Sequence, residues 1–185
     1  MIGERGHVPP ASPWSITLTY RHEHPWWFGA DDAPETWHIS ADIDDDNGPH
    51  GGSHVGDLDI TPVDAYQTRD PFALLDGQDA ELGHVAAILF DAGDGRLDPD
   101  LDEQLEPVGS RILILHSVRL VPEWRGFGLG ALLAGTAIRK LSGGARAAAC
   151  YPAPLNEPTQ EGTDDQGDAE WDEAVAALQQ VWARL

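Results

Sequence analysis

Residues 111–130 constrain the fold of this chain more than any other segment. They begin with four consecutive apolar residues, Ile112 to Leu115, and end in a loop with one proline and three glycines. An unbroken apolar run of this kind is typical of a central strand that is buried on both faces. Because apolar residues then recur at helical spacing from Leu129 to Leu141, the segment predicts a strand, a loop and a helix in that order.

The remaining patterns predict one α/β domain over residues 1–185, a length that can bury a core of its own. Alternating apolar and polar residues predict strands over residues 14–20, 37–43 and 54–63, and Pro62 is expected to end the third of these. A further short strand is predicted over residues 146–151, closed by Pro152 and Pro154. Helical spacing predicts helices over residues 79–90 and 171–185. Residues 1–12 are expected to form a flexible lead-in and residues 157–167 a mobile acidic loop.

The composition excludes several classes of partner. The chain has 32 acidic against 11 basic residues and a formal charge of −21, which repels phosphate backbones and anionic lipid and attracts cations. Its only cysteine, Cys150, cannot form an internal disulfide, and the sequence contains neither a secretion signal nor an apolar run long enough to cross a membrane. We therefore expect a cytoplasmic protein that binds neither nucleic acid nor membrane.

The loop before the second predicted helix has the chemistry of an anion site. Gly126, Gly128 and Gly130 occupy alternate positions, so the backbone can approach a bulky anion and direct successive amides at it. The helix N-terminus adds about half a positive charge, and Arg125 adds a full one. Such a loop suits a pyrophosphate, although glycines in this pattern also occur in ordinary strand-to-helix turns.

With its neighbours, the loop resembles a known signature. The order Arg125-x-x-Gly128-x-Gly130, after a strand that ends in Val121-Pro122, resembles the motif of the GNAT superfamily of acyl-CoA N-acyltransferases. The resemblance extends over roughly the second half of the chain. It implies an α/β fold with a mixed, mostly antiparallel sheet flanked by helices, splayed between the strand that contains residues 115–120 and the strand at residues 146–151.

The resemblance also implies a function and a binding site. The expected reaction is the transfer of an acetyl or related acyl group from acetyl-CoA, as co-substrate and without a metal, to a small-molecule or peptide amine. The backbone at the end of the central strand would pair with the pantetheine arm, and the glycine loop would hold the pyrophosphate. The CoA-binding residues are then Val118, Arg119, Leu120, Arg125, Gly126, Phe127, Gly128, Leu129 and Gly130.

Three residues are candidates for proton transfer. His116 stands where many GNAT members have a glutamate on the central strand, and a neutral imidazole is a competent general base near pH 7. On a regular strand His116 would share a face with Ile114 and Val118. Glu123 is a second candidate base. Tyr151 is a candidate acid, because the position of the usual acidic tyrosine on the last helix is occupied by Trp182, whose indole cannot supply a proton.

Trp182 at the position of the usual tyrosine leaves a second function open. This alternative is a catalytically degenerate CoA-binding module with a sensing or scaffolding role. By the resemblance, a final strand would follow the chain end at Leu185, and the open sheet edge expected there favours a homo-oligomer. A Rossmann dinucleotide site is a rival interpretation of the loop, since Gly126, Gly128 and Ala131 fit its permissive pattern. The histidines are scattered without cysteine partners, so no metal site is predicted.

Overall fold

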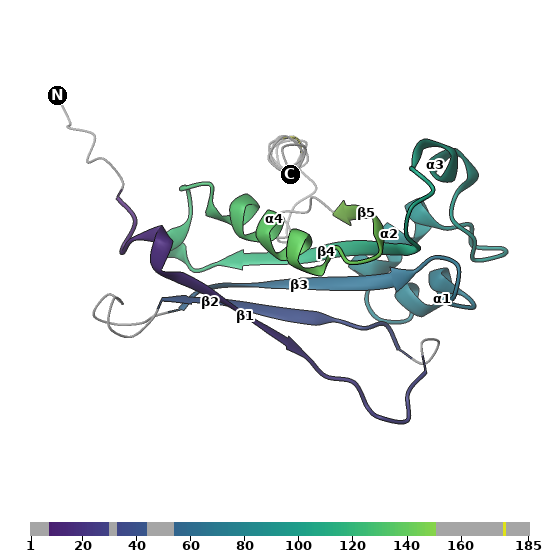
Figure 1. Ribbon diagram of the computed structural model, residues 1–185, viewed down its shortest axis with the longest axis horizontal. Helices are drawn as coiled ribbons and strands as arrows, with labels where there is room; N and C mark the ends of the chain where they lie inside the picture. The colour runs from purple at the N-terminus through teal and green to yellow at the C-terminus, as the bar shows by residue number, and fades with distance from the viewer. Residues whose placement is uncertain (1–7, 30–32, 44–53, 151–175, 177–185) are drawn as a thin grey trace, which may run out of the picture.

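The computed structural model describes residues 8–29, 33–43, 54–150 and 176 of the chain (Figure 1). They form one five-stranded sheet in which the strands follow the order of the sequence. The strands are β1 (Ile16–His22), β2 (Trp37–Ile43), β3 (His54–Asp64), β4 (Arg111–Leu120) and β5 (Ala145–Cys150). Neighbouring strands are antiparallel except for β4 and β5, which are parallel. The predicted mixed, mostly antiparallel α/β architecture is confirmed.

The helices lie in the two connections that flank β4. Between β3 and β4 the chain forms α1 (Pro71–Asp76), α2 (Ala80–Leu89) and α3 (Pro99–Gln104), and α4 (Leu129–Leu141) joins β4 to β5. Short 3-10 helices occur at η1 (Pro13–Ser15) and η2 (Pro122–Trp124). Helices α2 and α4 were predicted, whereas α1 and α3 were not. None of the helices in the described part of the chain is long and apolar enough to cross a membrane.

The sheet separates two hydrophobic clusters, one on each face. The first lies under α4 and includes Ile39, Leu58, Leu113, Leu115, Trp124 and Leu133. The second lies under α1 and α2 and includes Val63, Leu75, Leu82, Val85, Ile112 and Ile114. Figure 1 shows α4 on one side of the sheet. Helices α1 and α2 lie near the end of β3 and the start of β4. Because β4 contributes to both clusters, its unbroken apolar run is explained.

Two predicted strand boundaries are wrong. Strand β1 begins at Ile16 rather than at Trp14, because Pro13 starts a turn of 3-10 helix that its fixed φ favours. Pro62 does not end β3, which continues to Asp64. Beyond Ile60 the pairing of β3 with β2 has ended and β4 is its remaining described neighbour, so a residue without an N–H is tolerated there, as on an edge strand.

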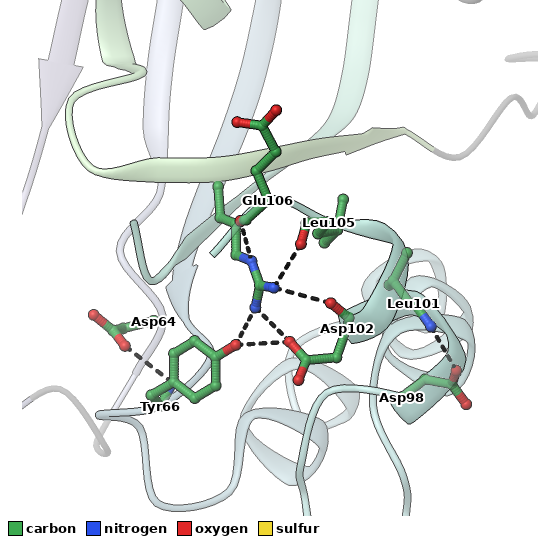
Figure 2. A network of polar contacts seen from close by, with 8 residues as sticks. Asp64, Tyr66, Asp98, Leu101, Asp102, Leu105 and Glu106 are labelled. Atoms are coloured by element: carbon green, nitrogen blue, oxygen red, sulfur yellow. Dashed lines mark hydrogen bonds and ion pairs between the residues drawn. The ribbon is translucent and has the colours of Figure 1, made fainter. Parts of the chain in front are cut away.

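A buried arginine ties α3 to β5 (Figure 2). The Arg146 side chain is only 6% exposed. Its Nε donates to the Glu106 carbonyl oxygen at 2.7 Å, and Nη2 donates to the carbonyl oxygens of Asp102 and Leu105, both at 3.0 Å. Nη1 contacts the Tyr66 hydroxyl and the Asp102 carboxylate. The guanidinium therefore satisfies three backbone carbonyls that close the connection between α3 and β4.

Replacing this arginine tests how much the network contributes to stability. We expect Arg146→Ala to lower the free energy of unfolding by about 2–3 kcal/mol, because several carbonyls lose their donors at once. Arg139→Ala is the matched control, since the exposed Arg139 bonds only the Thr136 hydroxyl within the described residues, and its loss should be within about 0.5 kcal/mol. Urea unfolding measures both values, and equal losses would contradict the assignment.

Candidate functional site

Strand β4 contains a β-bulge at His116. In the pairing of β3 with β4, Asp59 lies opposite Ser117 and Ile60 lies opposite Leu115, so His116 has no partner on β3. A bulge of this kind inserts one residue into a strand, re-aims its side chain and increases the local twist. The interruption falls at the residue that the sequence singled out as the candidate base.

The bulge overturns the predicted face of His116. A regular strand would place Ile114, His116 and Val118 on one face. Instead Ile114 belongs to the cluster under α1 and α2, whereas Val118 packs against the cluster under α4. The physical reason is the extra residue, which changes which side chains point to which face beyond it. Nothing in the sequence of β4 alone indicates where that change occurs.

Two adjacent polar atoms at the bulge are buried without partners. Within the described residues, neither His116 Nε2 nor the Ser117 hydroxyl has a hydrogen-bond partner, although both atoms are inaccessible to solvent. Buried polar groups are satisfied in the great majority of cases, and exceptions often belong to functional sites. Ser117 was not among the predicted site residues, because a serine in an apolar strand gives no signal of its own.

The glycine loop has an open, left-handed backbone. Gly126 and Gly128 have φ values of +83° and +71°, which side-chain-bearing residues rarely adopt. A Cβ placed on either residue would meet nothing within 4 Å. Gly128 is also the N-cap of α4, and no side chain caps that terminus. The amides of the first helical turn are therefore directed at open space, which is the arrangement that binds anions.

The residues between β4 and the glycine loop hold the loop in place. The indole of Trp124 is only 2% exposed and packs in the cluster under α4, which anchors η2. The Arg125 side chain is exposed, and its Nε donates to the Leu120 carbonyl oxygen at 2.7 Å. The other guanidinium nitrogens of Arg125 have no partner within the described residues. Glu123 is exposed and has no hydrogen bond or ion pair in the same part of the chain, so nothing links it to His116.

The end of β4 has a free backbone edge in the described part of the chain. Strand β5 pairs with β4 only as far as Leu115, which lies opposite Cys150, while β4 continues to Leu120. The remaining residues of β4 pair with β3 on the other side. The predicted splay cannot be read from this part of the chain, because Tyr151 and the residues that follow it lie outside the described residues.

The predicted CoA-binding residues follow one another along the end of β4, the loop and the start of α4, and they differ in exposure. Gly130 approaches β4, since a Cβ on it would lie 3.6 Å from Val118 Cγ1. Arg119, Arg125, Gly126 and Gly128 are exposed. Val118, Leu120 and Phe127 are half-buried and pack against the cluster under α4, and Leu129 is buried within it. Leu129 and Phe127 can therefore offer a ligand mainly their backbone.

Several predicted features fall outside the described residues. These are the candidate acid Tyr151, Trp182 at the usual tyrosine position, the acidic loop at residues 157–167 and most of the helix at 171–185. Cys150 is described, and it packs against the cluster under α4, where burial raises the pKa of its thiol. A thiol in that state is a packing group and a poor nucleophile.

Two of the described histidines, His38 and His54, pair with carboxylates. His38 Nδ1 lies 2.6 Å from Asp59 Oδ1, and the two ring nitrogens of His54 lie 2.9 Å from Asp42 Oδ1 and 3.1 Å from Asp57 Oδ2. The hydrogen bond to Asp42 raises the pKa of His54 above its ordinary value, with a further contribution from Asp57. Within the described residues no group of three or more His, Cys, Asp or Glu side chains could hold a metal ion.

The charge distribution favours an anion at this site. Six of the 11 Lys and Arg residues lie between Arg111 and Cys150, together with only one of the 32 Asp and Glu residues, Glu123. Helix α4 has no acidic residue in its first turn and has Arg139 and Lys140 in its last. The segment that forms β4, the loop and α4 is thus basic within a strongly acidic chain.

The sheet topology argues against a Rossmann site. That fold binds dinucleotides at the end of a mostly parallel sheet, whereas β1 to β4 are antiparallel and η2 separates β4 from α4. In comparisons with known proteins, no family model, no curated protein and no solved structure matches the chain.

Two glycine substitutions test the geometry of the loop through stability. We expect Gly128→Ala to lower the free energy of unfolding by about 1–2 kcal/mol, because alanine is strained at positive φ. Gly130→Ala should leave it unchanged or raise it by about 0.5 kcal/mol, since the added methyl makes ordinary contacts with Val118 and Leu120. Urea unfolding of the two variants gives the comparison, and an equal loss in both would rule out the left-handed cap.

Proposed function

We propose that this protein is an acyl-CoA N-acyltransferase of the GNAT type, which transfers an acetyl or related acyl group to an amine. The observation that supports this most strongly is the junction of β4 and α4. There, two left-handed glycines in open space precede an uncapped helix N-terminus, next to a strand end that no described strand covers on one side. The basic character of residues 111–150 is consistent with a polyanionic co-substrate.

Each part of the junction has a role in this proposal. The amides of Gly126, Gly128 and Gly130 bind the pyrophosphate, together with the Arg125 guanidinium, which the Leu120 carbonyl orients. The free edge of β4 over residues 118–120 offers its backbone groups to an extended pantetheine arm, in the manner of an added strand. The thioester would then lie toward the bulge, close to His116.

In the proposed reaction, the amine nitrogen attacks the thioester carbonyl and loses a proton, and the C–S bond breaks so that CoA leaves as a thiolate, which takes a proton from solvent. With the ring proton on Nδ1, the unpartnered Nε2 of His116 has a lone pair that can accept the proton of the amine directly or through water. Placing both reactants on one strand supplies much of the remaining acceleration.

The first test of the proposal is ligand binding. Acetyl-CoA at millimolar concentration should raise the melting temperature, because a ligand that binds only the folded state stabilises it, whereas NAD should not. Gly128→Glu should abolish the effect of acetyl-CoA, since its side chain enters the open space at the loop and adds a like charge. Differential scanning fluorimetry gives all three values.

Gly143→Glu is the matched control for this test. Gly143 follows α4 at its other end, and a Cβ there also meets nothing within 4 Å, so the same charge is added far from the loop. This variant should keep the full shift with acetyl-CoA. Equal shifts with NAD and acetyl-CoA, or no shift with either, would refute the proposed family.

The second test is turnover. We expect His116→Ala to release thiol from acetyl-CoA about a hundredfold more slowly with a good amine acceptor, while it still binds acetyl-CoA. The acceptors to compare are polyamines, aminoglycosides and amino-acid amines.

His84→Ala is the control for loss of a histidine, since His84 is exposed on α2, across the sheet from α4. It should retain the wild-type rate. A rate unchanged by His116→Ala would be compatible with a transferase but would exclude His116 as its base. Tight binding of acetyl-CoA with no turnover on any amine would leave the alternative, a non-catalytic CoA-binding module.

A further inference from the structure

The connection between β1 and β2 displays aromatic side chains to solvent. Trp26 is 87% exposed and Trp27 is 66% exposed, and Phe28 follows them. Figure 1 shows the described part of this connection continuing beyond the end of β1, away from the sheet. Single exposed apolar residues are common, but adjacent indoles in water are unfavourable and mark interaction surfaces. We refer to Trp26, Trp27 and Phe28 as the aromatic cluster.

Local contacts hold the aromatic cluster in one shape. The rings of Trp26 and Trp27 meet edge to face, with centroids 5.8 Å apart and planes at 89°. His24 Nε2 lies 3.1 Å from the Phe28 carbonyl oxygen, and the Phe28 N–H donates to the Pro25 carbonyl oxygen at 2.9 Å. Because the rings are already positioned, a partner loses less conformational entropy on binding to them.

The base of the connection is equally ordered. The ring of His22, the last residue of β1, stacks on Trp37, the first residue of β2, with centroids 5.0 Å apart and planes at 22°. The His24 ring lies 6.1 Å from that of His22 at a similar tilt. The indoles thus extend from a stacked platform that is continuous with the sheet.

Charge indicates what kind of partner fits. The chain has a formal charge of −21, and Glu23 and Glu35 are exposed on either side of the aromatic cluster. Arg21, the one Lys or Arg among the described residues of 8–43, is ion-paired with Glu23. A second copy of this chain, a nucleic acid or an anionic lipid surface would be repelled. A cation is attracted, and the faces of Trp rings bind Lys and Arg side chains.

We propose that the aromatic cluster is a docking surface for a basic segment of a partner protein, whose Arg and Lys side chains stack on Trp26 and Trp27. This goes beyond the proposed acyl transfer and does not depend on it. The aromatic cluster lies at the end of the sheet where His22 pairs with Trp37, whereas the glycine loop follows Leu120, which pairs with Gly56 toward the opposite end of β3. The two surfaces can therefore be tested separately.

The experiment uses the full chain and a fluorescein-labelled peptide rich in arginine, at physiological salt. Fluorescence anisotropy should show binding that weakens about tenfold in the double variant Trp26→Ala/Trp27→Ala, the loss expected for two exposed cation–π contacts. Trp14→Ala is the matched control, because Trp14 is 96% exposed but lies in η1, before the other end of β1. It should bind the peptide as the wild type does.

Several outcomes would overturn the proposal. Equal binding by the wild type and both variants would mean that the peptide senses only the overall negative charge. A dimer that forms with rising protein concentration and is lost in the double variant, without peptide binding, would assign the cluster to a second copy. Binding to zwitterionic vesicles in place of the peptide would assign it to a membrane surface. Acetyl-CoA should stabilise the double variant as it does the wild type, so this test and that of the proposed function fail independently.

Discussion

Burial of β4 on both faces is the constraint on which the rest of the structure depends. Leu113 and Leu115 face α4, while Ile112 and Ile114 face α1 and α2, so β4 needs a helical layer on each side. The layer of α1 and α2 comes before β4 in the chain, and α4 comes after it. Since β5 is parallel to β4, the chain must cross a face of the sheet between them, and α4 is that crossover. The crossover places a helix N-terminus directly beyond the end of β4.

The bulge at His116 reconciles two demands on the same strand. Up to Leu115, the even-numbered residues of β4, Ile112 and Ile114, pack in the cluster under α1 and α2, against which Leu101 of α3 also packs. Beyond it, Val118 and Leu120 must pack toward α4 and the loop, with Arg119 exposed. One extra residue achieves the change of face. Its consequence is a histidine whose Nε2 is buried with no partner in the described residues, which is a costly arrangement unless the group has a use.

The sequence predicts the elements that have strong periodicity and misses those that do not. Strands β1, β2 and β3 follow from alternation, β4 from its unbroken apolar run, and α2 and α4 from helical spacing, within a few residues at each end. Helices α1 and α3 have six residues each, too few for a helical stripe, and depend on a proline in the first turn and on the caps Asp70 and Asp98. These cap signals are visible in the sequence, but acidic and proline-rich segments equally predict turns.

The candidate site also has one part that the sequence predicts and one part that it does not. The glycine loop could be predicted because glycine at alternate positions is a local signal, and its left-handed backbone agrees with that prediction. The facing of His116 could not, since a bulge is a property of two strands and their register. Ser117 could not be predicted either, because only its burial without a partner among the described residues distinguishes it from other strand serines.

The uneven distribution of charge allows one acidic chain to attract ligands of opposite sign. Electrostatic interactions between exposed groups are screened over about 10 Å at 0.1 M salt, so each surface responds mainly to its own neighbourhood. Around the glycine loop, the segment from β4 to β5 supplies Arg119, Arg125 and the N-terminus of α4, with Glu123 as its one carboxylate, and Asp57 of β3 lies opposite Arg119. Around the aromatic cluster it contains Glu23 and Glu35. A polyanion is therefore favoured at one end of the sheet and a cation at the other, although the net charge alone would predict only the second.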